Sequence, residues 1–570
     1  MSVHARPACL HIRNFRGIPE LDVDLHAGTS TYVIGPNNAG KSTVLNAVAL
    51  AFKGAAFRTF TPGSYDYFRD LDGNHSDTFS VAVSFSPEGG SLPAVQGVGS
   101  PDDVHGIQVL GRTEKYGRLV YRHVLIGVDG KPITISQRTP LKGDVKEQYK
   151  DHGLGYSRHY ARPDEIREFL PKVWHLTPEN LDRSLYHWRT GPLRRLAKLL
   201  SSRFFEEDWE LEVEGGGTRA MPSALERVHG FLQDAVSKFP FWTQDLKPRL
   251  EETLGRYVGR QAHMELRPAV EALEDWLVDQ LVLSFAVDSG GPVTPLENMG
   301  QGWQSLVRMA ALDVLRQYPD QVKHSVVVLY EEPETYLHPH LARKLREVLD
   351  GLSAARWTII CSTHAPDLIS FRSNQSILRL WRNGATVERG TLLAESVPEA
   401  AKFQELLDER GNHELLFAAR VVLCEGKDDV LALRHYLSVS DADLDGRSVS
   451  VVDLGGAQTL PAYARLASDL GIPWCGLTDE DLQDDGNVKP ATQKARTRLG
   501  ELAGAHDLVP IWKVSLEGSL GISSGKATPE WQAGTLLPLS REEIKATYPA
   551  FADTCEEILE WVTAPLEDNS

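Results

Sequence analysis

The stretch TYVIGPNNAGKSTVLNAVALAF, residues 31–52, decides how the amino-terminal half of this chain folds. It begins with β-branched and aromatic residues typical of a buried strand. A glycine-containing turn follows, and then a segment with the apolar periodicity of a helix. The turn has the pattern G-x-x-x-x-G-K-S in the strand, loop and helix order that a phosphate-binding loop requires. The sequence therefore predicts a nucleotide-binding P-loop.

The residue types of this loop explain how it would bind ATP and Mg²⁺. Gly35 and Gly40 let the backbone curl so that its N–H groups and the helix amino-terminus face phosphate oxygens. Lys41 would neutralise the β- and γ-phosphates, and the Ser42 hydroxyl would ligate Mg²⁺. The predicted nucleotide-binding residues of the loop are Gly35, Asn38, Gly40, Lys41, Ser42 and Thr43.

Two further apolar segments end in polar residues suited to ATP hydrolysis. Val326 to Tyr330 predicts a buried parallel strand followed directly by two acids. We expect Glu331 to hold the Mg²⁺ of the nucleotide site and Glu332 to act as the base for the attacking water. The strand in ARWTIICSTHAPDL ends at His364, which we expect to contact the γ-phosphate.

The segment LENMGQGWQSLVRMAALDVL, residues 296–315, predicts a short glycine-containing turn that opens a long amphipathic helix. A helix amino-terminus of this kind can bind a phosphate. Glycine turns are common, so this pattern has little specificity by itself.

The order of these elements resembles the ATP-binding-cassette (ABC) ATPases of the structural-maintenance and RecF type. The resemblance implies that ATP is sandwiched between two heads and that His364 is the switch histidine. It implies that Arg16 lies near the nucleotide. The signature element that meets the P-loop of another subunit would then be Gly300, Gly302 and Ser305. The chain lacks the transporter sequence LSGGQ and a clear Q-loop glutamine, for which Asp66 is the candidate substitute.

The two parts of the ATPase pattern are separated by roughly residues 156–284, which are rich in amphipathic helix patterns. These residues carry no sustained heptad repeat, so we expect a compact helical insertion that packs against its copy in a second subunit. The basic run from Arg189 to Arg203 fits a surface that contacts DNA phosphates and a solvated helix face equally well.

From Arg420 onward the sequence alternates strand and helix patterns. The segments are RVVLC, VLALRHYLSV, SVSVVDLGG, LPAYARLASDL and PWCGLTDEDLQDD. A βαβαβ order with right-handed crossovers gives parallel strands whose carboxyl ends share one edge of the sheet, where ligands bind. Glu425 follows the first strand, and Asp479 and Asp481 follow the third. We therefore expect these acids to lie close together.

These acids predict a metal site. An all-oxygen ligand set suits Mg²⁺ or Mn²⁺ and not zinc. Asp429, one helical turn beyond Glu425, can join the set, and carboxylates this close need a cation to offset their repulsion. Any one of these residues alone would be an ordinary polar group at a strand end, but their joint placement favours a metal.

The spacing of Glu425 and Asp479-x-Asp481 resembles the Toprim domain of topoisomerases, primases and some nucleases. An ABC-type head with a helical insertion and a carboxy-terminal Toprim domain resembles the OLD (overcoming lysogenization defect) family, which includes the nuclease subunit of the Gabija anti-phage system. The resemblance spans nearly the whole chain. It implies an α/β protein with an ATPase amino-terminal lobe at residues 1–155 and a helical dimerisation insertion at 156–284. An ATPase carboxy-terminal lobe at 285–412 and a Rossmann-like Toprim nuclease domain at 413–570 would follow.

The same resemblance implies an ATP-hydrolysing, metal-dependent DNA endonuclease or nickase with two metal ions in the Toprim site. Lys526, preferred over Lys513, would place a positive charge near the scissile phosphate, and Glu517 would complete the second metal site. The implied cofactors are ATP and Mg²⁺ or Mn²⁺. The implied partners are DNA, further copies of the chain in a homodimer or homotetramer, and a helicase protein. The implied role is anti-phage defence.

Two rival functions stay open. One is an ATPase clamp for DNA ends or a partner protein, with a catalytically inactive Toprim module. The other is a primase or topoisomerase, although a topoisomerase needs a tyrosine in a DNA-gate domain and the chain has no room for one after the Toprim segment. Detection of ATPase activity without cleavage would favour the clamp.

Composition limits these alternatives. The 570 residues suggest about three or four domains. There is no apolar run long enough to span a bilayer and no signal peptide, so we expect a cytoplasmic protein without membrane contact. The net charge of -18 argues against a protein that coats nucleic acid through bulk charge, yet allows a local basic groove. The five scattered cysteines predict neither disulfides nor structural zinc.

Overall fold

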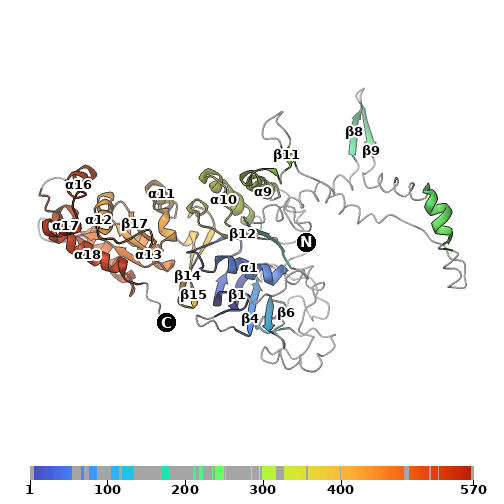
Figure 1. Cartoon of the computed structure of the whole chain (residues 1–570), viewed down its shortest axis with the longest axis horizontal. Coiled ribbons are helices and arrows are strands. Elements are labelled where there is room, and N and C mark those ends of the chain that lie inside the picture. The colour runs from blue at the N-terminus through green and yellow to red at the C-terminus, as the bar shows by residue number, and fades with distance from the viewer. Residues whose placement is uncertain are drawn as a thin grey trace. The chain divides into compact units, whose positions relative to one another are not determined.

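The computed structural model of the chain divides into two compact units (Figure 1). One comprises Met1–Pro178 with Val322–Ser570, and the other comprises Glu179–Gln321. The structure describes residues 6–53, 66–69, 76–86, 104–113, 119–133, 170–178, 209–213, 217–221, 231, 234, 238–249, 251, 284–285, 294–295, 298–315, 326–354, 357–397, 400–480, 487–512, 515–523 and 526–565.

A six-stranded sheet forms the centre of the ATPase part. Its strands in spatial order are β15 (Thr386–Leu393), β14 (Gln375–Asn383), β3 (Ser30–Ile34), β13 (Thr358–Ser362), β12 (Val326–Glu331) and β7 (Lys172–Leu176). All neighbours pair in parallel except β14 and β15. Strand β3 is buried along its whole length, as continuous apolar runs in parallel sheets are. Helices α1 (Lys41–Lys53) and α10 (Pro339–Ala354) pack against this sheet.

A second, antiparallel sheet shares its core with the first. Its order is β2 (Ile18–Asp24), β1 (Pro7–Phe15), β4 (Thr78–Phe85), β5 (Gly106–Thr113) and β6 (Leu119–Ile126). One apolar cluster joins Leu10 and Val81 of this sheet to Val48 of α1 and Leu329 of β12, and each of these side chains is fully buried. The P-loop helix is therefore held by both sheets.

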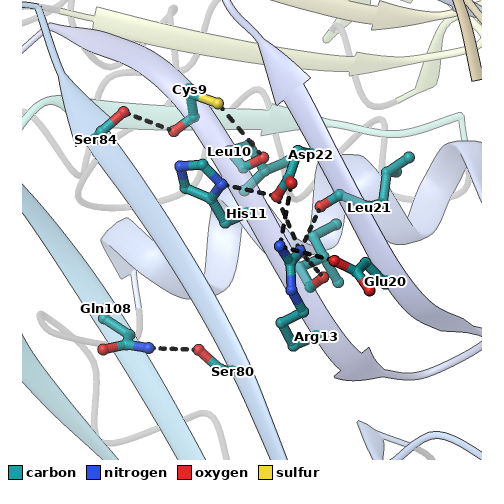
Figure 2. Close-up of polar contacts among 11 residues, drawn as sticks. Cys9, Leu10, His11, Arg13, Glu20, Leu21, Asp22, Ser80, Ser84 and Gln108 are labelled. Carbon is teal, nitrogen blue, oxygen red and sulfur yellow. Dashed lines mark hydrogen bonds and ion pairs between the residues drawn. The ribbon is translucent and has the colours of Figure 1, made fainter. Parts of the chain in front are cut away.

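Charged pairs fix the register of the first two strands (Figure 2). His11 lies opposite Asp22, and Arg13 lies opposite Glu20. Asp22 Oδ1 lies 2.7 Å from His11 Nδ1 and accepts a hydrogen bond from Arg13 Nη1 at 2.9 Å. The hydrogen bond from Arg13 lowers the pKa of Asp22. Opposite charges placed across an antiparallel pair favour this register over a slipped one.

The boundaries of the insertion differ from those expected. Strand β7 lies inside the predicted segment 156–284, yet it pairs with β12 in the ATPase sheet, so the first lobe extends past residue 155. The second unit also continues to Gln321 and includes the helix Gln301–Leu315, which we expected to carry the signature element in the second lobe. A short edge strand such as KVWHL has too few residues to be distinguished from its helical surroundings by periodicity.

The described part of the second unit also contains strands where helices were expected. A hairpin is formed by β8 (Trp209–Val213) and β9 (Gly217–Met221). The other elements are β10 (Ser284–Phe285), β11 (Thr294–Pro295), the π-helix η7 (Phe241–Leu246) and α9 (Gln301–Leu315). The basic run 189–203 lies outside the described residues.

The carboxy-terminal part confirms the predicted βαβαβ order. Strands β16 (Arg420–Cys424), β17 (Val449–Asp453) and β18 (Trp474–Gly476) form a parallel sheet in the order β17-β16-β18. Helices α12 (Lys427–Val439) and α13 (Leu460–Asp469) make the crossovers. A parallel pair, β19 (Thr478–Asp479) and β20 (Ile511–Trp512), continues beyond β18.

Helices surround this sheet and connect it to the ATPase part. They are α14 (Pro490–Leu502), α15 (Leu516–Ser519), α16 (Pro529–Thr535), α17 (Arg541–Thr547) and α18 (Pro549–Thr563). The connection comprises η11 (Ala394–Ser396), α11 (Ala400–Arg410) and η12 (Asn412–Phe417), whereas η10 (Pro366–Leu368) lies between β13 and β14 of the ATPase sheet. Among the described residues, none of the helices has the length and apolar character needed to cross a membrane.

Candidate functional site

The P-loop has the backbone geometry that its glycines predict. Gly35 has φ 136°, and a Cβ there would lie 2.1 Å from the Leu380 carbonyl oxygen of β14. Gly40 has φ 101°, and Asn38 has φ 64°. Only glycine adopts the φ angles of Gly35 and Gly40 without strain, so the curl of the loop ahead of α1 requires glycine at these two positions. Ser42 and Thr43 lie in the first turn of that helix.

Lys41 points into the loop that it follows. Its Nζ donates to the carbonyl oxygens of Gly35 and Pro36, both at 2.9 Å. Burial lowers the pKa of Lys41, and the nearby carboxylates of Glu332 and Glu334 oppose that shift. The ammonium group therefore lies between the phosphate-binding loop and the acidic turn after β12.

The two predicted ATPase acids have different surroundings. Glu331 closes β12, and its Oε1 lies 2.7 Å from Nε2 of His175 on the adjacent strand β7. Glu332 is exposed, adopts φ 42° and donates its backbone N–H to the Ser362 carbonyl at 2.9 Å. Strain of this kind is typical of functional turns. His175 is a residue that sequence reasoning missed, because the strand that carries it was not predicted.

Glu334 and His364 form a contact across the same turn. The backbone N–H of His364 donates to Glu334 Oε1 at 2.8 Å. Burial raises the pKa of Glu334, while burial and the charge of Lys41 lower the pKa of His364 below its ordinary value of 6.5. This shift favours the neutral imidazole, which can donate one hydrogen bond. Glu334 follows the acidic pair in the sequence EEPE, and that signal could have identified it.

Arg16 and Asp66, both singled out in the sequence, are in contact. Arg16 Nε donates to Asp66 Oδ1 at 3.0 Å, and its backbone N–H donates to the Asp66 carbonyl oxygen at the same distance. A second arginine that sequence reasoning missed supports the P-loop: Arg382 of β14 donates to the carbonyl oxygens of Asn38 and Gly17, at 2.8 and 2.9 Å.

The expected signature residues lie at the start of α9 in the other unit. Gly300 and Gly302 flank the first residue of that helix, and Ser305 is buried one turn later. Gln304 donates to the Met299 carbonyl oxygen at 3.0 Å and so closes the turn that precedes the helix. The structure thus confirms a turn that opens a helix, and a role in binding ATP stays a prediction.

The acidic edge of the carboxy-terminal sheet brings two predicted residues together. Glu425 directly follows β16, and Asp479 closes β19. The backbone N–H of Asp479 donates to Glu425 Oε1 at 3.0 Å. Arg496 of α14, which sequence reasoning missed, donates to the Asp479 carbonyl oxygen and to Thr478 Oγ1. Asp481 lies outside the described residues.

Asp429 is buried behind Glu425. Its Oδ2 accepts from the Gly426 N–H, and its Oδ1 accepts from Nε1 of Trp512, both at 2.9 Å. Burial and, next, the charge of Glu425 raise the pKa of Asp429 to about 7. A carboxyl in such a position gains from a cation that offsets its neighbour. Both of its oxygens already have an N–H partner.

Lys526 and Glu517 lie near the first turn of α12. Burial raises the pKa of Asp428; Lys526 opposes that shift, and Glu517 adds to it. Glu517 Oε2 accepts from the Ser515 hydroxyl at 3.1 Å, and its Oε1 accepts from the Ala527 N–H at 3.4 Å. Lys526 is exposed. The structure therefore places both predicted residues near the acidic edge, whereas Lys513 is outside the described residues.

The carboxylates at this edge offer the type of donor atom that a hard divalent cation prefers. Glu425, Asp429 and Asp479 offer oxygen atoms only, which are the donors that Mg²⁺ and Mn²⁺ prefer. Within the described residues no group of three His, Cys, Asp or Glu side chains is arranged to hold a metal ion. The fit therefore rests on the donor type and on the closeness of Glu425 to Asp429 and Asp479.

Comparisons with known proteins agree with both sites. A family model described as the Toprim domain of overcoming lysogenization defect protein-like proteins matches residues 416–481. Two others, described as an AAA ATPase domain and an AAA domain, match residues 244–369 and 9–175.

Two relatives and one solved structure resemble this chain over different shares of its length. The OLD nuclease of Thermus scotoductus is 24% identical over 564 residues, which are 93% of this chain and 94% of that protein. The Old nuclease of Escherichia phage P2 is 25% identical over 197 residues, 33% of each chain. A solved Smc head domain with an extended coiled coil, derived from Pyrococcus furiosus and bound to a domain of ScpA, has 13% identity and a TM-score of 0.36, and covers 71% of this chain and 99% of its own.

The Toprim match coincides with the acidic edge, the AAA matches coincide with the P-loop and the acidic turn, and one relative extends over nearly the whole chain. The chain is thus similar to OLD nucleases over nearly its whole length, with a P-loop ATPase part followed by an OLD-like Toprim domain.

Proposed function

We propose that this protein is an ATP-dependent, metal-dependent DNA endonuclease or nickase that cuts in its Toprim domain. The observation that carries the proposal is the contact of Glu425 with the Asp479 amide at the carboxyl edge of a parallel sheet. Ligands bind at this edge in such sheets. The two relatives named as OLD nucleases support the same activity.

The acidic edge would hold and orient the scissile phosphate. Glu425, Asp479 and Asp481 would bind Mg²⁺ or Mn²⁺, and Asp429 and Glu517 would contribute to the same site. When bound, a pair of such ions supplies an activated water and a stabilised leaving oxygen. Lys526 would place its ammonium group near the negative charge that develops on the phosphate.

The ATPase site would use the residues around the P-loop. The loop amides and Lys41 would bind the phosphates, with Mg²⁺ held by Ser42 and Glu331. Glu332 would accept the proton of the attacking water, and the neutral imidazole of His364 would donate to the γ-phosphate. A second copy of the chain would complete the site with its own signature helix, which implies a homodimer or a larger homo-oligomer.

One strand offers a route from the nucleotide to the Toprim domain. Leu380 of β14 lies against Gly35 of the P-loop, and the neighbouring Arg379 is buried and points towards the Toprim sheet. Its guanidinium donates to the carbonyl oxygens of Ala418, Leu470 and Gly471. Ala418 lies just before strand β16, which ends at Cys424, and Glu425 follows directly. The P-loop is therefore connected to the start of β16 by direct contacts of two neighbouring residues, which supports gating by ATP.

The proposal is tested with purified protein, supercoiled and linear DNA, Mg²⁺ or Mn²⁺, and ATP present or absent. Glu425→Gln keeps the side-chain volume and removes the charge, so we expect loss of cleavage with ATP hydrolysis retained. Glu414→Gln, at an exposed residue of the short helix η12 that precedes β16, is the matched control. Lys41→Ala shows how ATP acts on cleavage.

If the wild type hydrolyses ATP and leaves all DNA intact, the nuclease proposal fails. The chain would then be an ATPase clamp for DNA ends or a partner protein, with the Toprim domain as a binding module. A role in anti-phage defence, a helicase partner and a cytoplasmic location are part of our proposal on family resemblance alone.

A further inference from the structure

We propose that Trp512 and Asp429 act together as positioning residues of the Toprim site. In this arrangement the indole N–H of Trp512 holds Asp429, and Asp429 holds the turn that presents Glu425. The inference rests on the proposed function, because it concerns the site where cleavage would take place.

Asp429 links the turn to the domain core. One of its oxygens accepts from the Gly426 amide, the residue directly after Glu425, and the other accepts from the Trp512 indole. Gly426 is the N-cap of α12, and Asp429 is the third residue of that helix. The carboxylate therefore determines where strand β16 ends and where the helix begins, and Glu425 lies at that junction.

Trp512 is itself held rigidly. Its side chain is 1% exposed and stacks on Phe551 of α18, with ring centroids 5.2 Å apart and an angle of 12° between the rings. Its backbone pairs with Asp479 in the β19–β20 ladder, and its carbonyl oxygen accepts from the Glu480 N–H at 3.1 Å. One residue thus touches both acidic segments, through its backbone on one side and its side chain on the other.

These contacts form a closed ring. Trp512 holds Asp429, Asp429 holds the Glu425 turn, Glu425 accepts from the Asp479 amide, and Asp479 pairs with Trp512. The Glu425 carboxylate is therefore held against the Asp479 backbone by a ring that includes a buried indole. Groups that orient metal ligands in this way change metal affinity when they are removed, even without touching the metal.

A core role alone would not require this acceptor. A buried tryptophan needs a partner for its N–H, and a backbone carbonyl would satisfy it. Here the partner is a carboxylate next to the proposed metal ligand, so removing the N–H changes the site as well as the core. The two roles make different predictions for a variant that keeps the ring packing.

The test compares Trp512→Phe with Phe551→Leu in the full-length chain. Trp512→Phe keeps an aromatic ring against Phe551 and removes the donor, whereas Phe551→Leu disturbs the same stack and keeps the donor. Mn²⁺ binding is measured by calorimetry without nucleotide, beside thermal stability and ATP turnover. We expect Trp512→Phe to weaken Mn²⁺ binding by about tenfold or more, as loss of an orienting partner does. We expect Phe551→Leu to change it less than about twofold at a comparable loss of melting temperature.

Hydrogen exchange gives a readout that needs no metal. The peptide containing residues 424–430 should exchange faster in Trp512→Phe than in Phe551→Leu, because the Gly426 amide loses a fixed acceptor. Equal exchange and equal Mn²⁺ affinity in the two variants would overturn the positioning role. If the wild type neither cleaves DNA nor binds Mn²⁺, the proposed function fails, and the exchange comparison still decides whether Trp512 positions the turn.

Discussion

Replacement of Arg379 by methionine should uncouple DNA cleavage from ATP. Arg379 is 3% exposed and lies on β14, opposite Ile34 at the end of the P-loop strand. Methionine keeps most of the apolar volume of the side chain and removes every hydrogen bond to the Toprim domain. We expect both activities to survive individually, because neither site loses a residue.

The structure sets the size of the effect on stability. Arg379 Nη2 donates to the Ala418 carbonyl at 2.8 Å, and Nη1 donates to the carbonyls of Gly471 and Leu470 at 3.2 and 3.3 Å. The two longer contacts share one nitrogen and count as one bond, so two charged hydrogen bonds contribute about 3–6 kcal/mol. Burial lowers the pKa of Arg379 from 12.5 to about 10, a cost of about 3 kcal/mol that the variant avoids. The net loss of stability should therefore be about 0–3 kcal/mol.

The assay is the ratio of DNA cleavage rates with and without ATP, measured beside phosphate release and the melting temperature. We expect this ratio to move towards one in Arg379→Met, whichever direction ATP acts in the wild type. Arg389→Met is the control, because Arg389 is exposed on the neighbouring strand β15. Arg379→Lys keeps the charge and part of the bonding, so it should give an intermediate ratio.

One result would refute this reasoning. If Arg379→Met lowers the melting temperature and yet shows the wild-type ATP ratio, the buried arginine stabilises the junction and transmits nothing. ATP control would then have to act through the second unit or through a second copy of the chain.

Three further predictions follow from single contacts. Glu334→Gln should weaken the acceptor for the His364 amide and lower ATP turnover about tenfold, the equivalent of one hydrogen bond, with nucleotide binding unchanged; a wild-type rate of phosphate release would contradict it. Gly35→Ala should abolish binding of a fluorescent ATP analogue, because a Cβ would lie 2.1 Å from the Leu380 oxygen; retained binding would show that the loop can shift. Glu556 has its pKa lowered from 4.5 to about 2, although burial alone would raise it, because Tyr436 and Arg541 hydrogen-bond the carboxylate. The ionised Glu556 carboxylate therefore contributes about 1–2 kcal/mol to the free energy of unfolding, a value reduced because the side chain is partly exposed. This contribution is present above pH 4.5 and is lost as the pH falls towards 2. The melting temperature of Glu556→Gln should thus lie below that of the wild type at pH 7, with a gap that narrows below pH 4.5, and a constant gap would exclude this mechanism.

The local sequence was enough to predict those parts of the two sites that are contiguous in the chain. The P-loop could be predicted because Gly35, Gly40 and Lys41 meet a steric and electrostatic demand within one loop. The order of strands and helices around Glu425 could be predicted because the length and periodicity of apolar runs show which faces of each strand or helix are buried. The edge shared by Glu425 and Asp479 followed from the handedness of crossovers, which holds for nearly all parallel sheets.

The tertiary structure alone decided which distant residues complete these sites. His175 contacts Glu331 across 156 residues, and Trp512 contacts Asp429 across 83. Local sequence patterns do not identify such partners, since they do not distinguish a buried tryptophan, or a histidine on a short edge strand, from any other core residue. The limits of the inserted unit belong to the same class, because β7 becomes part of the ATPase sheet only by pairing with β12. Sequence periodicity reports the burial of a segment, whereas the identity of its neighbour depends on the packing of the whole chain.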